Sequence, residues 1–399
     1  MAPSDRGLVG VEVELLTYPS ADPGRRAPAG DLRAIAERTR LPARSRITLE
    51  PGGQIEISTP PLRGLHDALP AAAADLGAIS AVLRRAGIQP VARGLDTLRA
   101  PRRILDQPRY AAMEAFFDAD GFAGRTMMCS TASVQVNVET GPPGGVAVRW
   151  RLAHALGPVL VAMFAHSPVP GGGGRGPRSA RQQVWSVMDP SRTSPVHRVA
   201  SPRLLRPEEE WLDYALAARV MMIRATPERF VAVDAPPGPE PPTFAAWMER
   251  GHELGWPALD DFEYHLTTLF PPVRPRGWLE LRMLDSLPDP WWRVAAAVAT
   301  ALLEDGDAGA AALEAVSAPP AGAGVTDHWR SAARHGLADP GLRAAAQRVF
   351  PAALGGLGRL GADRATVAAA EAFHERFVAR GRCPADEPAP IPEAEPASV

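Results

Sequence analysis

The chain contains no lysine: all 43 of its basic residues are arginine, in a sequence of 399 residues. A P-loop needs a lysine on the phosphates, pyridoxal-phosphate enzymes need a Schiff-base lysine, and protein kinases need a strand lysine. The sequence therefore excludes these three classes. A bias towards alanine, glycine, proline and arginine is typical of a GC-rich genome and explains most of the absence. If this protein handles a polyphosphate, arginine and metal ions must neutralise it.

Other features are also scarce. The two cysteines, Cys129 and Cys383, cannot form a disulfide framework and belong to no CxxC pair, which favours a reducing compartment. The net charge is only −2, and no basic cluster indicates a nucleic-acid face. The best apolar run, Gly157 to Ala165, is too short to span a membrane, and the N-terminus lacks a secretory signal. We therefore expect a cytoplasmic protein, monomeric or weakly oligomeric, without nucleic-acid or membrane partners.

Hydrophobic residues make up 46% of the chain, which is enough for a large core. We expect a single catalytic domain over residues 1–383, with its motifs in 7–290 and an alanine-rich helical part in 291–383. Helices are expected over 101–118 and 207–225, among others, and the glycine run at 171–174 predicts a mobile loop. Residues 384–399 are rich in Pro, Ala and Glu and are expected to form a disordered tail.

Four segments alternate between apolar and polar residues, as strands do when their two faces meet different surroundings. They are Leu8–Leu15, Gln54–Ser58, Ser133–Glu139 and Trp278–Met283. The apolar positions are mostly valine, isoleucine and leucine. The polar positions are Glu12, Glu14, Gln54, Glu56, Ser58, Ser133, Gln135, Asn137, Glu139, Glu280 and Arg282.

An antiparallel sheet with helices on one face and water on the other would explain any one of these strands. Together they fit that interpretation less well, because solvated faces usually mix Thr, Lys, Ser and Arg. On one sheet face these carboxylates would lie close enough to repel each other and to raise each other's pKa. A hard divalent cation would relieve the repulsion. Oxygen ligands without a Cys or His cluster indicate Mg²⁺, with Mn²⁺ as an alternative.

Further candidates for binding phosphate or substrate lie outside the strands. They are Arg125 before the third strand, Arg181 and Arg192 after the glycine run, and His265 and Arg274 before the fourth strand. Each of these residues alone is more often a partner in a structural ion pair or hydrogen bond than a catalytic group.

The motifs resemble those of the glutamate–cysteine ligases, in the branch that includes the plant-type and ergothioneine-pathway enzymes. The resemblance rests on Gly10–Glu14, on EPGGQIE at Glu50–Glu56, on TASVQVN at Thr131–Asn137, and on Phe270–Arg274 running to Glu280–Arg282. The segment Tyr264–Phe270 is most similar to the ergothioneine-pathway subgroup. The resemblance implies an α+β fold like that of glutamine synthetase, in which an antiparallel sheet forms an open funnel with helices packed outside.

The resemblance also implies a two-step reaction of glutamate, cysteine and ATP. The γ-phosphoryl group of ATP would first pass to the side-chain carboxylate of glutamate, giving γ-glutamyl phosphate. The amine of cysteine would then displace phosphate, giving γ-glutamylcysteine. Phosphorylation supplies the leaving group that a carboxylate lacks, and the protein mainly has to position the reactants and neutralise their charge.

Site residues follow from the resemblance and from strand position. The predicted Mg²⁺ ligands are Glu12, Glu14, Glu50, Glu56 and Glu280. The predicted amide contacts to substrate, phosphate or metal are Gln54, Gln135 and Asn137. Arg282 and Arg274 are predicted to act on the transferring phosphoryl group, where lysine is absent. Arg125 and Arg192 are predicted to bind the α-carboxylate of glutamate.

Two alternatives stay open. A related carboxylate–amine ligase with a different amine acceptor would share the metal and ATP motifs. A catalytically silent relative that binds glutamate or nucleotide as a regulator would be expected to have lost metal carboxylates, and none is missing here.

Overall fold

In the computed structural model, the described residues are 7–169, 176–197, 206–226, 229–233, 242–316 and 325–388. The glycine run at 171–174 lies outside these ranges, as does most of the expected tail, residues 389–399.

A central antiparallel sheet carries the four alternating segments. Its strands lie in the order β2-β3-β1-β6-β10-β9, and two short strands, β4 and β5, also pair with β1. The bounds are β1 Leu8–Pro19, β2 Arg46–Leu49, β3 Ile55–Ser58, β4 Leu62–Arg63, β5 Ile88–Val91, β6 Ser133–Glu139, β9 Val273–Pro275 and β10 Trp278–Asp285. The predicted segments form β1, β3, β6 and β10, which are consecutive neighbours.

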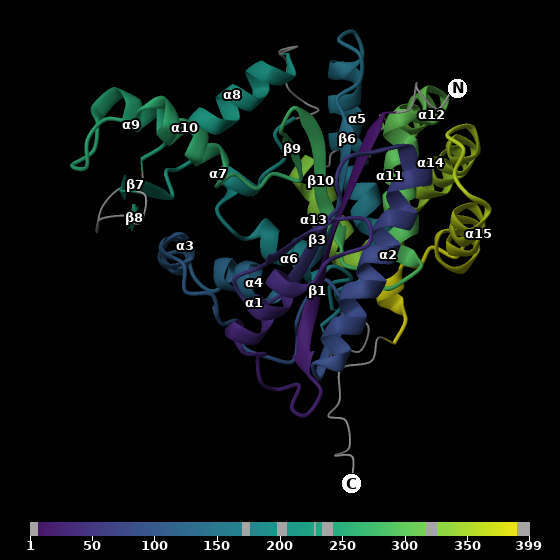
Figure 1. Ribbon diagram of the computed structural model, residues 1–399. Coiled ribbons are helices and arrows are strands. Elements are labelled where there is room, and N and C mark those ends of the chain that lie inside the picture. The colour runs from purple at the N-terminus through teal and green to yellow at the C-terminus, as the bar shows by residue number, and fades with distance from the viewer. Residues whose placement is uncertain are drawn as a thin grey trace.

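One face of the sheet is apolar and covered by helices. Val11 of β1, Val136 of β6 and Leu281 of β10 are fully buried in the main core. Helices α2 (Gly64–Arg85), α5 (Val146–Phe164) and α11 (Trp291–Glu304) pack against this face. The predicted antiparallel sheet with helices on its outer face is confirmed (Figure 1).

Three C-terminal helices, α12 (Gly306–Val316), α14 (Pro340–Arg359) and α15 (Arg364–Phe373), form a further layer behind this one (Figure 1). Helix α13 (Val325–His335) packs instead against α5. Phe350 and Phe373 belong to the same hydrophobic cluster as the valines of β1. The motif-bearing part and the helical part of the chain therefore share one core.

Short helices and one hairpin lie on the opposite, polar side of the sheet (Figure 1). The helices are α1 Ala29–Arg38, α3 Pro108–Asp118, α4 Ala123–Ser130, α6 Ala180–Ser186, α7 Pro190–Thr193, α8 Pro207–Ala217, α9 Phe244–Arg250 and α10 Leu259–Leu266. The hairpin consists of β7 (Met222–Thr226) and β8 (Arg229–Ala232).

Strand β10 contains a bulge that changes which residues face the core. Leu281 lies opposite Val136, but Leu284 lies opposite Val134, so Arg282 and Met283 together face one residue of β6. An extra residue in one strand reverses the alternation beyond it. Leu284 therefore points into the core, and Asp285, opposite Ser133, returns to the polar side.

Three predicted boundaries were wrong. The helix expected over 207–225 ends at Ala217, and the chain then forms β7, because Met221 and Met222 pack into a second apolar cluster. The helix expected over 101–118 begins at Pro108, since the residue before a proline favours extended backbone. The expected tail begins too early: Pro384–Asp386 form a 3-10 helix, and Asp386 is ion-paired to Arg178.

Helix α5 is long and apolar enough to cross a membrane by length and composition, contrary to the expectation that no segment approaches that length. Within the molecule, 67% of the apolar stretch of α5 is buried, as in the central helix of a packed core.

Candidate active site

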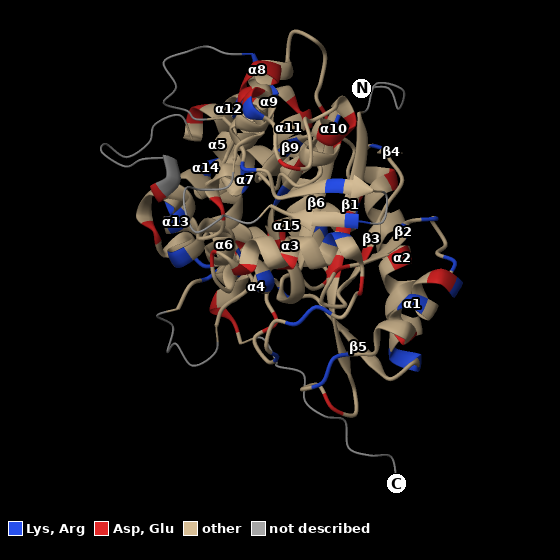
Figure 2. Ribbon diagram, turned by 90° about the vertical axis from the view of Figure 1, so that its left-hand side faces the viewer, with Lys and Arg blue, Asp and Glu red and all other residues tan. Residues whose placement is uncertain are grey.

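A cavity of about 840 Å³ lies on the polar face of the sheet. Acidic and basic residues both lie along the central strands (Figure 2). The sheet and its loops contribute Glu12, Glu14, Thr48, Glu50, Gln54, Glu56, Ser58, Ser133, Gln135, Arg274, Arg276, Trp278, Glu280 and Arg282. Facing residues from other elements include Arg109, Tyr110, Met113, Met127, Met128, Arg181, Trp185 and Phe270.

Three carboxylates converge in this cavity. Glu14 and Glu56 lie opposite each other in the β1–β3 ladder. Glu50 joins them because residues 50–54 form a tight turn, closed by hydrogen bonds from Glu50 N to Gln54 O (2.9 Å) and from Gly53 N to Glu50 O (2.8 Å). One carboxylate oxygen from each of the three glutamates lies within 4.8 Å of the others.

Glycine is required in that turn for two reasons. Gly53 has a φ of 92°, in the region that side chains disfavour. A Cβ atom on Gly52 would lie 2.1 Å from the carbonyl oxygen of Cys129, so the turn packs directly against the end of α4. The Pro51-Gly52-Gly53 sequence therefore places Glu50 over the sheet and closes that wall of the cavity.

Burial raises the pKa of each carboxyl group in this region. For Glu12 the pKa rises to about 7, through burial and then through repulsion from Glu56 and Glu280. The pKa of Glu50 lies well above its ordinary value because of burial and the charges of Glu56 and Glu14. Burial likewise raises the pKa values of Glu14 and Glu56. Within the described part of the chain, none of the four forms an ion pair.

These residues suit a hard divalent cation. Carboxylate oxygens are the ligands that Mg²⁺ and Mn²⁺ prefer, and a cation would remove the repulsion that now raises the pKa values. Neighbouring groups already fix the carboxylates: Thr48 Oγ1 donates to Glu56 Oε1 (2.7 Å), and the Ser133 amide donates to Glu14 Oε2 (2.7 Å). Such contacts orient metal ligands.

The other end of the polar face is held by arginines. Arg274 binds both oxygens of Glu280, at 2.6 and 2.8 Å, and Arg282 Nη1 lies 2.6 Å from Glu280 Oε1. Although burial acts to raise the pKa of Glu280, the two guanidinium groups lower it to about 2. Glu280 therefore differs from the other predicted ligands in being neutralised already. Oε1 accepts from both arginines, whereas Oε2 accepts only from Arg274 Nε and keeps a second lone pair, so Glu280 stays a candidate ligand through Oε2.

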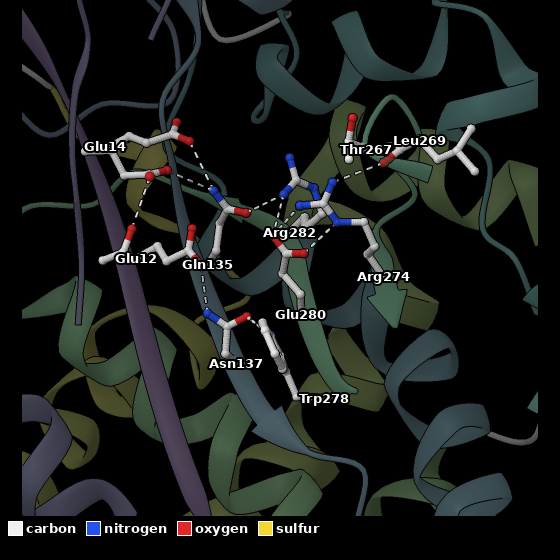
Figure 3. Close-up of polar contacts among 12 residues, drawn as sticks. Glu12, Glu14, Gln135, Asn137, Thr267, Leu269, Arg274, Trp278, Glu280 and Arg282 are labelled. Atoms are coloured by element: carbon white, nitrogen blue, oxygen red, sulfur yellow. Dashed lines mark hydrogen bonds and ion pairs between the residues drawn. The ribbon is translucent and has the colours of Figure 1, made fainter. Parts of the chain in front are cut away.

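Gln135 connects the two ends (Figure 3). Its Nε2 donates to Glu14 Oε1 at 3.1 Å, and its Oε1 accepts from Arg282 Nη1 at 2.6 Å. A side-chain amide can donate and accept at once, which a second carboxylate could not do. Gln135 therefore lies between the carboxylates and the arginines, with both ends of its amide bound to protein groups, and its contact with a ligand stays a prediction.

The other two predicted amides are engaged within the protein. Asn137 Nδ2 donates to Glu12 Oε1 (2.9 Å), and its Oδ1 accepts from Trp278 Nε1 (2.9 Å), so it orients Glu12 and does not line the cavity (Figure 3). Gln54 uses its Nε2 on the carbonyl of Thr131 (2.8 Å), while its buried Oε1 has no hydrogen bond among the described residues. Only Gln54 of this pair has an atom left for a ligand.

The two arginines predicted to bind a substrate carboxylate are not at the cavity. Arg125 points away on α4, where it pairs with Asp118 and Glu114. Arg192 is fully buried and donates to Asp189 Oδ2 (2.8 Å) and to the carbonyl of Arg219 (2.6 Å). Both guanidinium groups are held by local structure, so this part of the prediction is corrected.

Arg181 is the arginine that the residue assignments missed. It lines the cavity and is 3% exposed. Its Nη2 donates to the carbonyl of Arg282 (2.8 Å), but Nε and Nη1 have no hydrogen bond within the described chain. The sequence marked Arg181 only as one of several arginines near the glycine run, because nothing local distinguishes it from Arg192.

Comparisons with known proteins agree with this geometry. A family model described as glutamate-cysteine ligase family 2 (GCS2) matches residues 8–393. Glutamate–cysteine ligase EgtA of Mycolicibacterium smegmatis is 43% identical over 388 residues, covering 96% of this chain and 86% of that protein. EgtA of Mycobacterium tuberculosis is 40% identical over 392 residues, covering 94% and 87%.

Two solved structures share the fold at low identity. Glutamate–cysteine ligase of Francisella tularensis, in complex with AMP, has a TM-score of 0.53 at 12% identity and covers 95% of this chain and 83% of that one. A bifunctional glutathione synthetase from Pasteurella multocida has a TM-score of 0.54 at 15% identity, covering 96% and 49%. The family match over nearly the whole chain confirms the resemblance predicted from the motifs: the chain belongs to glutamate–cysteine ligase family 2.

Proposed function

We propose that the protein is a glutamate–cysteine ligase that forms γ-glutamylcysteine from glutamate, cysteine and ATP. One observation carries the proposal: a single cavity holds converging carboxylates that form no ion pair among the described residues, beside buried arginines to which Gln135 joins them. Family membership and the 40–43% identity to the two EgtA proteins support the same activity.

The carboxylate end would hold Mg²⁺. Glu14, Glu50 and Glu56 have their oxygens close enough to share one ion, and Glu12 lies on the same strand face as Glu14. When bound, the ion would neutralise phosphate charge on ATP, which is the main requirement of phosphoryl transfer. Mn²⁺ has the same ligand preference and is the second candidate.

The arginine end would act on the group in transfer. Arg282 and Arg274 are fixed by Glu280, so their guanidinium groups need little reorganisation as charge develops on the phosphoryl oxygens. Lysine could not reproduce this arrangement, because its single ammonium lacks the planar fork.

Arg181 would bind a carboxylate of the substrate. It is buried at the cavity wall, two of its nitrogens have no hydrogen bond among the described residues, and a carboxylate is the ligand that a guanidinium fork fits best. The apolar wall near it, with Met127, Trp185 and Phe270, would limit water around the γ-glutamyl phosphate intermediate, which water would otherwise hydrolyse.

The product would supply ergothioneine synthesis, since Tyr264–Phe270 is most similar to the ergothioneine-pathway subgroup and the most similar relatives described above are EgtA proteins. A cytoplasmic location and a monomeric or weakly oligomeric state belong to the same proposal. Both cysteines are buried and free, which agrees with a reducing compartment.

The deciding experiment measures phosphate release by purified protein with ATP, Mg²⁺ and glutamate, with and without cysteine, and identifies the product by mass. We expect release that depends on cysteine, with γ-glutamylcysteine as the product. Release that depends on another amine would replace the acceptor and keep the reaction type. No release with any amine would overturn the proposal and favour a silent, ligand-binding relative.

A further inference from the structure

A buried carboxylate outside the predicted site lies just behind the cavity wall. Asp285 is the last residue of β10 and is 2% exposed. The bulge in β10 turns it towards α6 and away from the helical core. Three groups donate to it: Ser179 Oγ to Oδ1 (2.9 Å), and Ser167 Oγ and the His166 amide to Oδ2 (2.7 and 2.8 Å).

The two serines connect this carboxylate to the start of α6. Ser179 is the N-cap residue of α6 and accepts from the Gln182 amide (3.2 Å). Ser167 Oγ accepts from the Arg181 amide (3.1 Å). The chain leaves Asp285 at Ser167 and returns to it at Ser179, so one carboxylate fixes both ends of the segment between them. The backbone orientation of Arg181 is set by this arrangement.

Asp285 also faces the Arg181 side chain. Arg181 Nη1 lies 3.8 Å from Asp285 Oδ1, which is an ion pair without a direct hydrogen bond. The other nearby carboxylate that attracts Arg181 is Glu14, a predicted metal ligand. Asp285 and Glu14 therefore both attract the guanidinium, and Asp285 is the one that forms an ion pair with it.

We propose that Asp285 is a positioning residue that holds Arg181 in the orientation needed to bind the carboxylate of the anionic substrate. The inference rests on the proposed function for the identity of that substrate, glutamate. Asp285 touches no reactant itself: it acts through Arg181, by charge and by fixing the first turn of α6.

The substitution Asp285→Asn removes the negative charge of this side chain but can keep its hydrogen bonds. With its oxygen at the Oδ2 position, asparagine can still accept from Ser167 and His166, and its amide can donate to Ser179 Oγ. Only the negative charge facing Arg181 is lost. We expect the KM for glutamate to rise about tenfold or more, while the KM for ATP changes by less than about twofold.

Asp305→Asn is the matched control. Asp305 is also a buried carboxylate that pairs with an arginine, Arg359 (2.6 Å), and caps a helix by accepting from the Ala308 amide (2.8 Å), but it lies outside the cavity. We expect this variant to lower Tm without changing the KM for glutamate. Ser179→Ala, which keeps the charge of Asp285 and removes one contact, should raise that KM by about threefold.

A double-mutant cycle decides between positioning and general destabilisation. In an Arg181→Met background, Asp285→Asn should raise the KM for glutamate by no more than about twofold, because its effect passes through Arg181. The same rise in both backgrounds, or an Asp285→Asn enzyme with the wild-type KM for glutamate, would overturn the inference.

Glutamate binding measured by calorimetry, with a non-hydrolysable ATP analogue and Mg²⁺, keeps the two proposals apart. Absence of γ-glutamylcysteine synthesis by the wild-type protein would count against the proposed function. A wild-type protein that is active, loses glutamate affinity with Arg181→Met and keeps it with Asp285→Asn would count against the role of Asp285 alone.

Discussion

The two ends of the polar sheet face put the same residue type in opposite electrostatic states. Glu12 on β1 and Glu280 on β10 both lie beside β6 and are both surrounded by polar groups. The pKa of Glu12 is raised to about 7, whereas that of Glu280 is lowered to about 2. Burial acts to raise both pKa values, so the difference comes from the neighbouring charges: Glu56 and Glu280 repel Glu12, whereas Arg282 and Arg274 contact Glu280.

This difference indicates which kind of ligand each end of the sheet face suits. Ionised buried carboxylates without an ion pair cost stability that a bound cation would restore, which is why we propose a metal site at Glu12, Glu14, Glu50 and Glu56. At the other end, Glu280 fixes two guanidinium groups and leaves a net positive charge, which suits phosphoryl oxygens. Gln135, being neutral, joins the two ends without favouring either charge.

The largest expected effect is on the stability of the metal-free protein, which the same Glu→Gln substitution should change in opposite directions at the two ends. Glu280→Gln should lower stability by about 3–5 kcal/mol, because it leaves Arg274 and Arg282 buried without a counter-charge. Glu56→Gln should raise stability by about 1 kcal/mol, because it removes one of several repelling charges. Tm in EDTA at pH 8 measures both changes.

Both of these variants should lose ligase activity. Glu280→Gln should lose stability as well, whereas Glu56→Gln should become more stable while losing activity. The exposed pair Arg206–Glu209 offers a control, since Glu209→Gln should leave Tm and activity unchanged. If Glu56→Gln and Glu280→Gln shifted Tm in the same direction, the two ends would not differ as described.

A smaller effect is expected when Arg282 is replaced by lysine. Arg282 Nη1 contacts both Glu280 and Gln135, and a lysine ammonium cannot hold the same planar orientation. We expect kcat to fall about 100-fold, with a smaller change in the KM for ATP. Arg293→Lys, at an exposed ion pair with Asp289, is the control. A kcat within about threefold of the wild type would show that charge alone suffices at this position.

The raised pKa of Glu12 predicts how metal and pH act together. A carboxyl group whose pKa is higher in the folded state contributes stability below its ordinary value of 4.5 and loses it as pH rises to about 7. Without metal, wild-type Tm should therefore fall relative to Glu12→Gln between pH 5 and 8. Added Mg²⁺ binds the ionised form, so it should raise wild-type Tm more at pH 8 than at pH 5.

The measured quantity is the difference in Tm between wild type and Glu12→Gln at each pH. Other titrating groups are present in both proteins, so their effects on Tm cancel in this difference. An equal Mg²⁺ effect at both pH values, or parallel Tm curves for wild type and Glu12→Gln, would mean that Glu12 is not part of a cation site.

The smallest effect tests the corrected assignment of Arg125. Its partners are Asp118 and Glu114, and its side chain is 36% exposed outside the cavity. Arg125→Met should leave the KM for glutamate and kcat within about twofold of the wild type, whereas Arg181→Met should not. Equal losses in the two variants would return Arg125 to the substrate site.

Much of the site was predictable because it depends on local periodicity. Alternation along β1, β3, β6 and β10 places their polar residues on one face whichever strands become neighbours. The turn at Pro51–Gly53 is equally local, and it brings Glu50 to the cluster. These features allowed the carboxylate cluster and the need for a cation to be predicted before any pairing was known.

The arginines could not be assigned in this way. Arg125, Arg181 and Arg192 lie in similar loop or short-helix sequence, and only packing decides that Arg192 is enclosed by Asp189 and that Arg181 faces the cavity. The β7–β8 hairpin was missed for the same reason, since Met221 and Met222 are buried at the start of β7 through contacts with distant elements.

By itself, the sequence determined the polar face, the glutamates on it and the glycines of the turn, because a strand fixes the direction of its side chains residue by residue. Only the tertiary structure decided which glutamates keep an uncompensated charge, which arginine reaches the cavity, and that the bulge in β10 turns Asp285 towards α6. Charge compensation acts over distances in space and not along the chain, so it follows from the contacts that folding creates.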